Sequence, residues 1–422
     1  MTPFLLAQPR VSGAPSAGNN LQACAIVFVI SIVAATFQIT HWVHPTMGFG
    51  HEDVDVARSL AATGSFADPF GSHTGPTAHV APLYPLLLAG LLKSAGAGDL
   101  AGHIMVWLTI LAYAGCAVLL VLVSNVLFHD AVPGILGALL VNCVPQFRMD
   151  PAWETTCISA GVLALILLLA HLRETGARLF WKLALAGAFA GMLVLMNPAV
   201  ILIVLPALVV LYGSQVKVWG VFLTVMFLVC LPWTIRNYRV FHAFFFVRDN
   251  LGLELYVSNN DCEASRIWNA GCPAHPTASR AETEAVREMG ELNYNRDRMA
   301  KATAWISTHR AAFLQLVFER FAGFWFPLSG YAPPPFSFGV CCTTLLSLPG
   351  LAWMYRRRRD AAWLMFAVAA AYPWLYCLVR SDIRYRYPIL WVSLLPAGYF
   401  LAQLAPLVRK WRRSEVLSPA IR

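Results

Sequence analysis

Apolar segments long enough to cross a lipid bilayer recur along nearly the whole of this 422-residue chain. A transmembrane helix needs roughly 20 consecutive apolar residues, and the first such segment runs from Leu21 to Trp42. Only 13% of the residues are charged, whereas about 25% are charged in a typical soluble domain. The pattern predicts an all-α polytopic membrane protein and argues against the two or three soluble domains that the length alone suggests.

Ten segments are predicted to span the membrane. They are Leu21–Trp42, Ile104–Phe128, Ala131–Phe147, Thr155–His171, Phe180–Met196, Ala199–Tyr212, Val216–Ile235, Phe338–Tyr355, Ala361–Val379 and Pro388–Leu407. The first is too long for a signal-peptide core and is predicted to be retained. The apolar segment Pro82–Ala95 is too short to span the bilayer, so it is predicted to be an in-plane or re-entrant helix.

The distribution of basic residues predicts the orientation. If Pro82–Ala95 does not span, the cluster Arg173, Arg178 and Lys182 lies on the same side as Arg356–Arg359 and the C-terminal tail. Basic loops favour the cytoplasmic side, so both termini are predicted to be cytoplasmic. The formal charge of +9 is then a topology signal, and no nucleic-acid partner is expected.

This topology predicts the domain organisation. We expect a cytoplasmic tail over residues 1–20, a single transmembrane domain over 21–407, and a basic cytoplasmic tail over 408–422. Residues 44–103 form a first outer loop with in-plane helices, and residues 236–337 form a large outer loop.

Two of the ten cysteines, Cys262 and Cys272, lie in the predicted large outer loop. An oxidising compartment permits a disulfide between them, and two free thiols are the alternative. No Cys/His spacing in the sequence resembles a zinc site.

Acidic residues are scarce, and two groups of them fall in predicted outer loops. Glu52, Asp53 and Asp55 stand in GHEDVDVARSL, where they either begin a helix lying on the membrane surface or supply a general base there. Asp150 and Glu154 stand in RMDPAWETT on the same side of the membrane. Asp150 precedes a proline and is predicted to cap a helix, whereas Glu154 is the functional candidate. The two loops predict a metal site or an acid/base pair, with solvated helix caps as the alternative.

Arginines also occur in predicted outer loops, against the positive-inside trend. Arg236 follows a predicted span, and Arg384 and Arg386 stand in the last outer loop, RSDIRYRYP. The guanidinium group suits phosphate oxygens, so these residues indicate either a lipid-phosphate substrate or contact with lipid headgroups.

Four stretches resemble, in order and spacing, the GT-C superfamily of membrane glycosyltransferases. Within it the resemblance is to bacterial relatives of protein O-mannosyltransferases and aminoarabinose transferases, and it covers Gly48 to Gly398. The stretches are GFGHEDVDVARSLAATGSFADPF with TGPTAHVAPLYPLLLAGLLK, WETTCISAGVLALILLLA, LPWTIRNYRVFHAFFFVRDNLGLELYVSNN and RYRYPILWVSLLPAG. The resemblance implies a GT-C-like fold in the bacterial inner membrane.

The family moves a sugar from a polyprenyl-phosphate donor to a lipid or glycan acceptor at the periplasmic face, with inversion at the anomeric carbon. Carried onto this sequence, the first-loop acid is Glu52 or Asp53, with Glu52 preferred, and the second-loop acid is Glu154. Many relatives place an Asp-Glu pair further ahead of their A-x-x-L motif than Glu52-Asp53 stand here, so both acids are retained as candidates. Other expected site residues are Arg384, Arg386 and Arg236 for the donor phosphate, and Asp55, His79 and Tyr84 for the substrate pocket.

Several points stay open at this stage. No cofactor is implied with certainty, and a divalent metal stays possible because relatives differ. A carrier or flippase for a lipid-linked saccharide is the alternative function; such proteins place ionisable groups near mid-membrane, whereas the predicted spans here carry few charges. A non-catalytic membrane subunit is the third reading.

Overall fold

The structure is a computed structural model. It describes residues 17–42, 51–71, 73–96, 98–145, 153–175, 180–269, 271–327 and 334–416, so Asp150 lies outside it. The described residues form helices and two isolated β-bridges, which agrees with the predicted all-α class.

The helices form a bundle and a loop layer. The bundle contains α1 (Ala17–Trp42), α4 (Asp99–Phe128), α5 (Val132–Cys143), α6 (Thr155–Glu174), α7 (Phe180–Met196), η1 (Pro198–Val200), α8 (Ile201–Tyr212), α9 (Val216–Phe241), α15 (Pro334–Arg357), α16 (Arg359–Ala371), α17 (Pro373–Leu378), η3 (Ile383–Ile389) and α18 (Trp391–Val416). The loop layer contains α2 (Glu52–Thr63), α3 (Leu83–Ala95), α10 (Leu251–Ser258), α11 (Asp261–Ser265), η2 (Pro276–Ala278), α12 (Arg280–Met289) and α13 (Glu291–Thr308). The helix α14 (Arg310–Trp325) leads from this layer back to the bundle.

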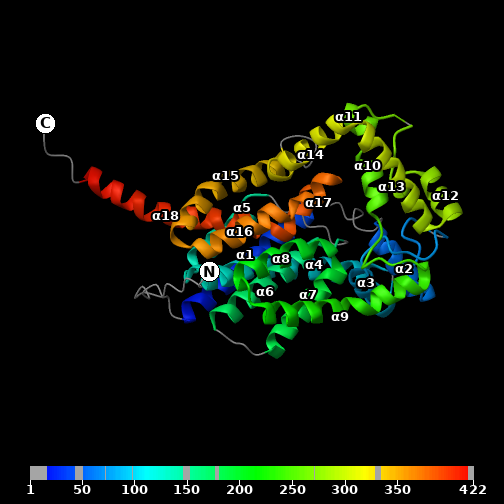
Figure 1. Cartoon of the computed structure of the whole chain (residues 1–422). Coiled ribbons are helices and arrows are strands. Elements are labelled where there is room, and N and C mark those ends of the chain that lie inside the picture. Colours follow the sequence, from blue (N-terminus) through cyan, green and yellow to red (C-terminus); the bar gives the residue numbers. More distant parts are fainter. Residues whose placement is uncertain are drawn as a thin grey trace.

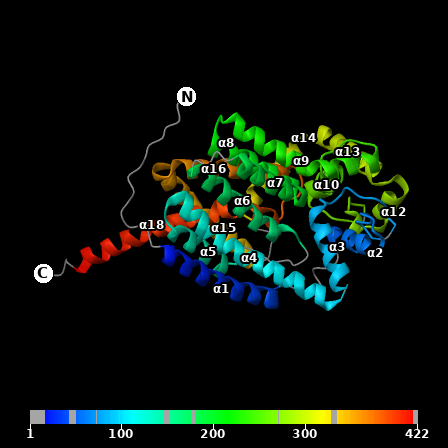
Figure 2. The same ribbon diagram turned by 90° about the horizontal axis from the view of Figure 1, so that it is seen from below.

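The bundle helices run in a common direction, and the loop layer covers one end of them (Figure 1). Seen from below, α2, α3, α12 and α13 again lie together at that end (Figure 2). The two predicted outer loops, although far apart in the sequence, therefore form one layer.

The described part of the chain contains six helices that are long and apolar enough to cross a membrane. The bent pair Ile383–Ile389 and Trp391–Leu404, with an angle of 66° between its halves, brings the number to seven if it counts as one span. The remaining predicted spans correspond to α5, α7 and α8, which are shorter apolar helices. The chain is thus a multi-pass membrane protein, but the predicted count of ten spans is not confirmed.

The helix break between α7 and α8 has a local cause. Asn197 has extended backbone angles and precedes Pro198, and the residue before a proline is biased away from helical geometry. The Asn197 side chain accepts a hydrogen bond from the Ala199 amide at 3.0 Å, which satisfies one exposed donor of the next turn. This break places Asn197 beside the start of α6, where it contacts Glu154.

Close helix packing in the bundle depends on small residues. A Cβ atom on Gly350 of α15 would lie 2.0 Å from the carbonyl oxygen of Pro396 in α18. A Cβ on Gly398 of α18 would lie equally close, 2.0 Å, to the carbonyl oxygen of Pro133 in α5. Membrane helices associate through such close backbone contacts, because lipid offers no hydrophobic driving force between them. α18 is therefore clamped between α5 and α15.

Hydrogen bonds join the two loops of the loop layer. The Glu291 carboxylate, at the start of α13, accepts from the Ala78 amide at 2.6 Å, and the Asp249 amide donates to the Ala78 carbonyl at 3.0 Å. Arg236, near the end of α9, donates to the carbonyl oxygens of Thr77 at 2.7 Å and Phe66 at 3.1 Å. The first loop is thus fastened to both α9 and α13.

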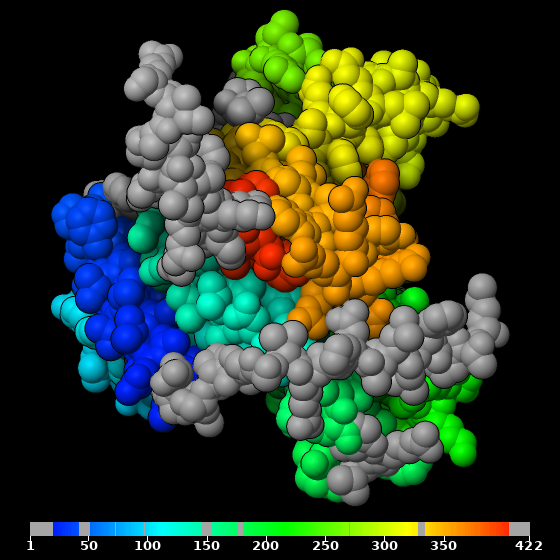
Figure 3. Space-filling view, turned by 90° about the vertical axis from the view of Figure 1, so that its left-hand side faces the viewer, coloured from blue at the N-terminus to red at the C-terminus, as the bar shows by residue number. Residues whose placement is uncertain are grey.

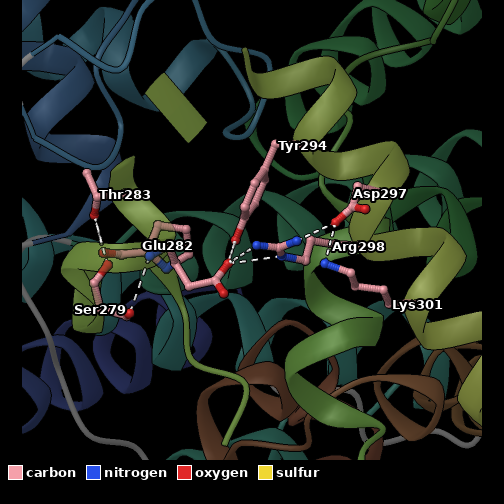
Figure 4. A network of polar contacts seen from close by, with 8 residues as sticks. Ser279, Glu282, Thr283, Tyr294, Asp297, Arg298 and Lys301 are labelled. Atoms are coloured by element: carbon pink, nitrogen blue, oxygen red, sulfur yellow. Dashed lines mark hydrogen bonds and ion pairs between the residues drawn. The ribbon is translucent and has the colours of Figure 1, made fainter. Parts of the chain in front are cut away.

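A second set of polar contacts holds α12 against α13 (Figure 4). The Glu282 carboxylate accepts from Arg298 Nη2 at 2.6 Å and from the Tyr294 hydroxyl at 2.5 Å. Arg298 also pairs with Asp297, which in turn pairs with Lys301 at 2.9 Å. We call Glu282, Tyr294, Asp297, Arg298 and Lys301 the α12–α13 network.

Candidate active site

Carboxylates from two distant parts of the sequence meet at the end of the bundle beneath the loop layer. Glu52 and Asp53 stand in the first turn of α2, where the helix dipole favours negative charge. Glu154 is the N-cap residue of α6. The charges of Glu154 and Glu52 both act on Asp53, so the structure brings together the three acids that the sequence analysis selected.

Asp53 is the most buried of these acids, with 8% of the residue exposed. Burial first, and then the charges of Glu154 and Glu52, raise the pKa of the Asp53 carboxyl well above its usual range. Arg248 and Arg384 act in the opposite direction. Such an environment gives a carboxylate the basicity that a general base needs near neutral pH.

Glu154 has one satisfied and one unsatisfied oxygen. Its Oε1 accepts from Asn197 Nδ2 at 3.3 Å. Its Oε2 is buried and has no hydrogen-bond partner among the described residues. Buried polar atoms are almost always paired in native proteins, so this oxygen indicates a place for a bound group.

Arg384 is held over the aromatic ring of Trp153, the residue before Glu154. Its guanidinium carbon lies 3.5 Å from the ring centroid, and its Nη2 donates to the Tyr385 hydroxyl at 3.3 Å. Its Nε is buried without a hydrogen-bond partner in the described parts of the chain. Arg384 therefore lies beside the acids, and its Nε–H is available to donate a hydrogen bond to a ligand.

Arg248 is a candidate site residue that the sequence analysis did not select. It lies between α9 and α10, and its charge acts on both Asp53 and His79. Its Nε is also buried and has no partner among the residues described. The only sequence signal was an arginine in a predicted outer loop, which several other arginines share. We call Asp53, Glu154, Arg248 and Arg384 the acid cluster.

The two other predicted phosphate-binding arginines lie elsewhere. Arg386 is 1% exposed, and its Nη2 donates to the hydroxyls of Thr344 and Ser393, both at 2.7 Å. Arg236 fastens the first loop to α9, as described above, and stacks on Trp233 with 4.7 Å between guanidinium carbon and ring centroid. In this structure both arginines hold helices and loops together, although Arg386 Nε, like Arg384 Nε, is buried with no partner among the described residues.

Glu52 faces two histidines. Ligand atoms of Glu52, His79 and His275 all lie within 4.8 Å of one another, and Glu52 Oε1 is 3.6 Å from His275 Nε2. Burial, followed by the charges of His275 and Arg248, lowers the pKa of His79 well below its usual value, so its imidazole is neutral and free to bind a metal. Two histidines and a glutamate are a ligand set that zinc accepts with one position left open. We call these three residues the His–Glu cluster; His275 was not selected from the sequence.

The remaining predicted pocket residues take packing roles. Asp55 pairs with Arg58 at 3.1 Å along α2, and partial burial raises the pKa of its carboxyl. Tyr84 of α3 is 8% exposed and packs with Val54 and Ala57 of α2. Of the three, His79 is the one that belongs to the His–Glu cluster.

Cys262 and Cys272 form a disulfide, with 5.9 Å between their Cα atoms. His275 is the third residue after Cys272. The bond closes a loop whose end leads directly into the His–Glu cluster.

Comparison with solved structures identifies the fold. The oligosaccharyltransferase AglB of Archaeoglobus fulgidus superposes with a TM-score of 0.56 in its apo form, at 15% identity over 96% of this chain and 53% of that one. AglB in complex with an inhibitory peptide and a dolichol-phosphate gives a TM-score of 0.53, at 14% identity over 96% of this chain and 52% of that one. This chain thus spans about half the length of AglB.

ArnT from Cupriavidus metallidurans bound to undecaprenyl phosphate is also similar, with a TM-score of 0.37 at 12% identity over 91% of this chain and 78% of that one. No protein-family model matches the sequence, and no curated protein matches it. The resemblance drawn from the sequence is confirmed at the level of the fold, which this chain shares with AglB.

Proposed function

We propose that this protein is a membrane glycosyltransferase that moves a sugar from a polyprenyl-phosphate donor to a lipid or glycan acceptor, with inversion, on the loop-layer side of the membrane. The observation that carries the proposal is the acid cluster. It combines a buried carboxylate of raised pKa, a second carboxylate with an unpaired oxygen, and two arginines with unpaired donors. The GT-C fold supports the same reaction class, since its AglB neighbour was solved with a dolichol-phosphate.

In the proposed reaction Asp53 takes the proton of the acceptor hydroxyl. The hydroxyl oxygen attacks the anomeric carbon from the face opposite the phosphate, and the bond between that carbon and the phosphate oxygen breaks. The electron pair leaves with the lipid phosphate, whose charge Arg384 and Arg248 neutralise. Attack from the opposite face accounts for inversion.

The choice of Asp53 over Glu52 rests on their different neighbours. Glu52 is directed to His275 and His79, whereas Asp53 is buried among Glu154 and the two arginines. We therefore propose Glu52 as a ligand of the His–Glu cluster and Asp53 as the base. A divalent metal held by Glu52, His79 and His275 supplies Lewis-acid polarisation of a hydroxyl or phosphate oxygen when bound.

The test is a transfer assay on purified protein in lipid, with a panel of radiolabelled polyprenyl-phosphate sugars. Wild type is compared with Asp53→Asn, Glu154→Gln and Glu52→Gln. Loss of turnover in well-folded Asp53→Asn, together with inverted product, supports the proposal. Wild-type turnover in all three variants contradicts the site, and transport of donor across the bilayer without transfer contradicts the enzyme class in favour of a carrier.

Metal content is measured separately. Elemental analysis of wild type and of His79→Ala with His275→Ala shows whether these residues retain a metal. Equal metal content in both proteins contradicts the assignment of the His–Glu cluster.

A further inference from the structure

The helix α14 buries an arginine on its inward face and exposes large hydrophobic residues on its outward face. Its inward face, Leu316, Arg320 and Phe324, is buried, and the Arg320 guanidinium donates to Asn259 Oδ1 at 3.0 Å and to the Leu378 carbonyl at 3.2 Å. Its outward face is apolar. Leu314 is 65% exposed and Phe318 is 72% exposed, although both are large hydrophobic residues.

The exposed residues of α14 form a stripe. Leu314, Phe318 and Phe321 follow the i, i+4, i+7 spacing that places side chains on one helix face. A contiguous exposed apolar surface of this kind marks a contact with membrane or protein.

The stripe is continuous with the surface of a candidate membrane span. The rings of Phe321 and Trp374 stack with 5.8 Å between centroids, and Trp374 belongs to the span Arg359–Leu378. Trp374 is 54% exposed, and Leu378 at the end of that span is also exposed. The exposed apolar surface of this candidate span therefore continues onto α14 through the Phe321–Trp374 contact.

The disulfide-closed loop prolongs this surface in the other direction. Arg266 Nη2 donates to Glu319 Oε2 of α14 at 2.8 Å, which fastens the loop to the helix. The next two residues, Ile267 and Trp268, are largely exposed. Tryptophan is enriched in the zone where the bilayer meets water.

The position of α14 suits this contact. Figure 3 looks along the bundle from the end opposite the loop layer, and the yellow residues that include α14 project sideways beyond the orange α15 and α16. In Figure 1, α14 is inclined to the bundle axis, and its end near α11 lies furthest from that axis. Part of the helix thus lies to the side of the bundle.

We propose that Leu314, Phe318 and Phe321 of α14, together with Ile267 and Trp268 at the tip of the disulfide-closed loop, form a bilayer-contact surface. Its partner is the lipid leaflet on the loop-layer side. Trp268 lies at the headgroup level and α14 lies along the acyl boundary. Because only two residues separate Cys272 from His275, this contact also fixes the distance of the His275 backbone from the membrane.

The test uses fluorine NMR on the full chain in lipid nanodiscs, with every tryptophan replaced by 5-fluorotryptophan. Trp268→Phe assigns the Trp268 resonance, and Trp268→Tyr assigns it if the first variant fails to fold; Trp374→Phe assigns the lipid-facing reference. Lipids spin-labelled near the headgroup and a water-soluble gadolinium chelate are then added in separate experiments.

We expect the spin-labelled lipid to remove most of the Trp268 signal, as it does for Trp374, and the gadolinium chelate to act less. Broadening of Trp268 by the chelate without broadening by the lipid overturns the proposal, because the tip then faces water. Resistance to both probes also overturns it, because a protein partner or a second copy of the chain then covers the tip. This measurement is independent of whether the protein transfers sugar.

Discussion

The acid cluster and the α12–α13 network contain the same types of side chain but differ in how completely those side chains are paired. In the network, the Glu282 carboxylate receives donors from Tyr294 and Arg298, and Asp297 is shared by Arg298 and Lys301 (Figure 4). In the acid cluster, Glu154 Oε2, Arg248 Nε and Arg384 Nε are buried with no partner among the described residues. A paired network stabilises the fold, whereas unpaired buried groups indicate a surface built for a ligand.

The largest effect is expected at the proposed base. Asp53→Asn should lower turnover by about 10²- to 10⁴-fold, the contribution usual for general base catalysis, because the amide cannot accept the proton. The matched control is Asp55→Asn on the same helix, whose carboxylate pairs with exposed Arg58. Its turnover should stay close to wild type in the transfer assay; an equal loss in both variants would assign the effect to α2 as a whole.

The next largest effect is expected on folding stability, when the α12–α13 network loses Arg298. Arg298→Met leaves the half-buried Glu282 without its cation, at a cost in folding free energy below the about 3–5 kcal/mol typical of a fully buried pair. Arg280→Met is the control, since the Arg280–Glu284 pair is exposed and surface pairs contribute little. Thermal unfolding should show a lower Tm only for Arg298→Met. If folded Arg298→Met protein bound the donor more weakly than wild type, the α12–α13 network would contribute to the candidate active site.

A pH effect follows from Glu291. Burial raises the pKa of its carboxyl from 4.5 to about 7, so the fold favours the protonated form. Its contribution to stability is full below pH 4.5 and is lost as the pH rises through about 7, by at most about 3 kcal/mol. Comparing unfolding of wild type and Glu291→Gln at pH 5 and pH 8 checks this. The wild type should lose more stability than the variant on going to pH 8, and parallel losses would contradict it.

The smallest expected effect separates two arginines that stand two residues apart. Arg384→Lys keeps the charge but loses the planar stack on Trp153, so the donor KM should rise by about tenfold, or ~1.4 kcal/mol, with unchanged Tm. Arg386→Lys should lower the Tm and leave the donor KM unchanged, because the Arg386 guanidinium contacts Thr344 and Ser393. A lower Tm in Arg384→Lys together with a higher donor KM in Arg386→Lys would contradict this, and would make Arg386 the donor-binding residue.

The sequence predicted the parts of the fold that depend on local composition. The apolar segments match helices, α2 begins at Glu52 as expected, and α3 covers nearly the whole of Pro82–Ala95. The count of spans was less predictable, since the break at Asn197–Pro198 and the short α5 make length a poor guide.

The site was predicted only in part, because its members meet through tertiary contacts. Asp53 and Glu154 were selected as rare acids, but His275 reaches Glu52 across more than half the chain, and no local pattern marks it or Arg248. Arg384 and Arg386 lie in the same short helix η3, and the direction of that turn decides which faces the acids. The sequence motif alone does not predict which of the two arginines faces the acids.

The pH dependence of transfer by wild type and Glu154→Gln tests the central claim most directly. Transfer requires ionised Asp53, whose pKa is raised by burial and by the charge of Glu154, so activity in the wild type should rise with pH well above the usual carboxyl range. Removing the Glu154 charge should move this rise to lower pH, even if the maximum rate falls. A rise at the same pH in both proteins would contradict the account, because the titrating group would then not be a carboxylate beside Glu154.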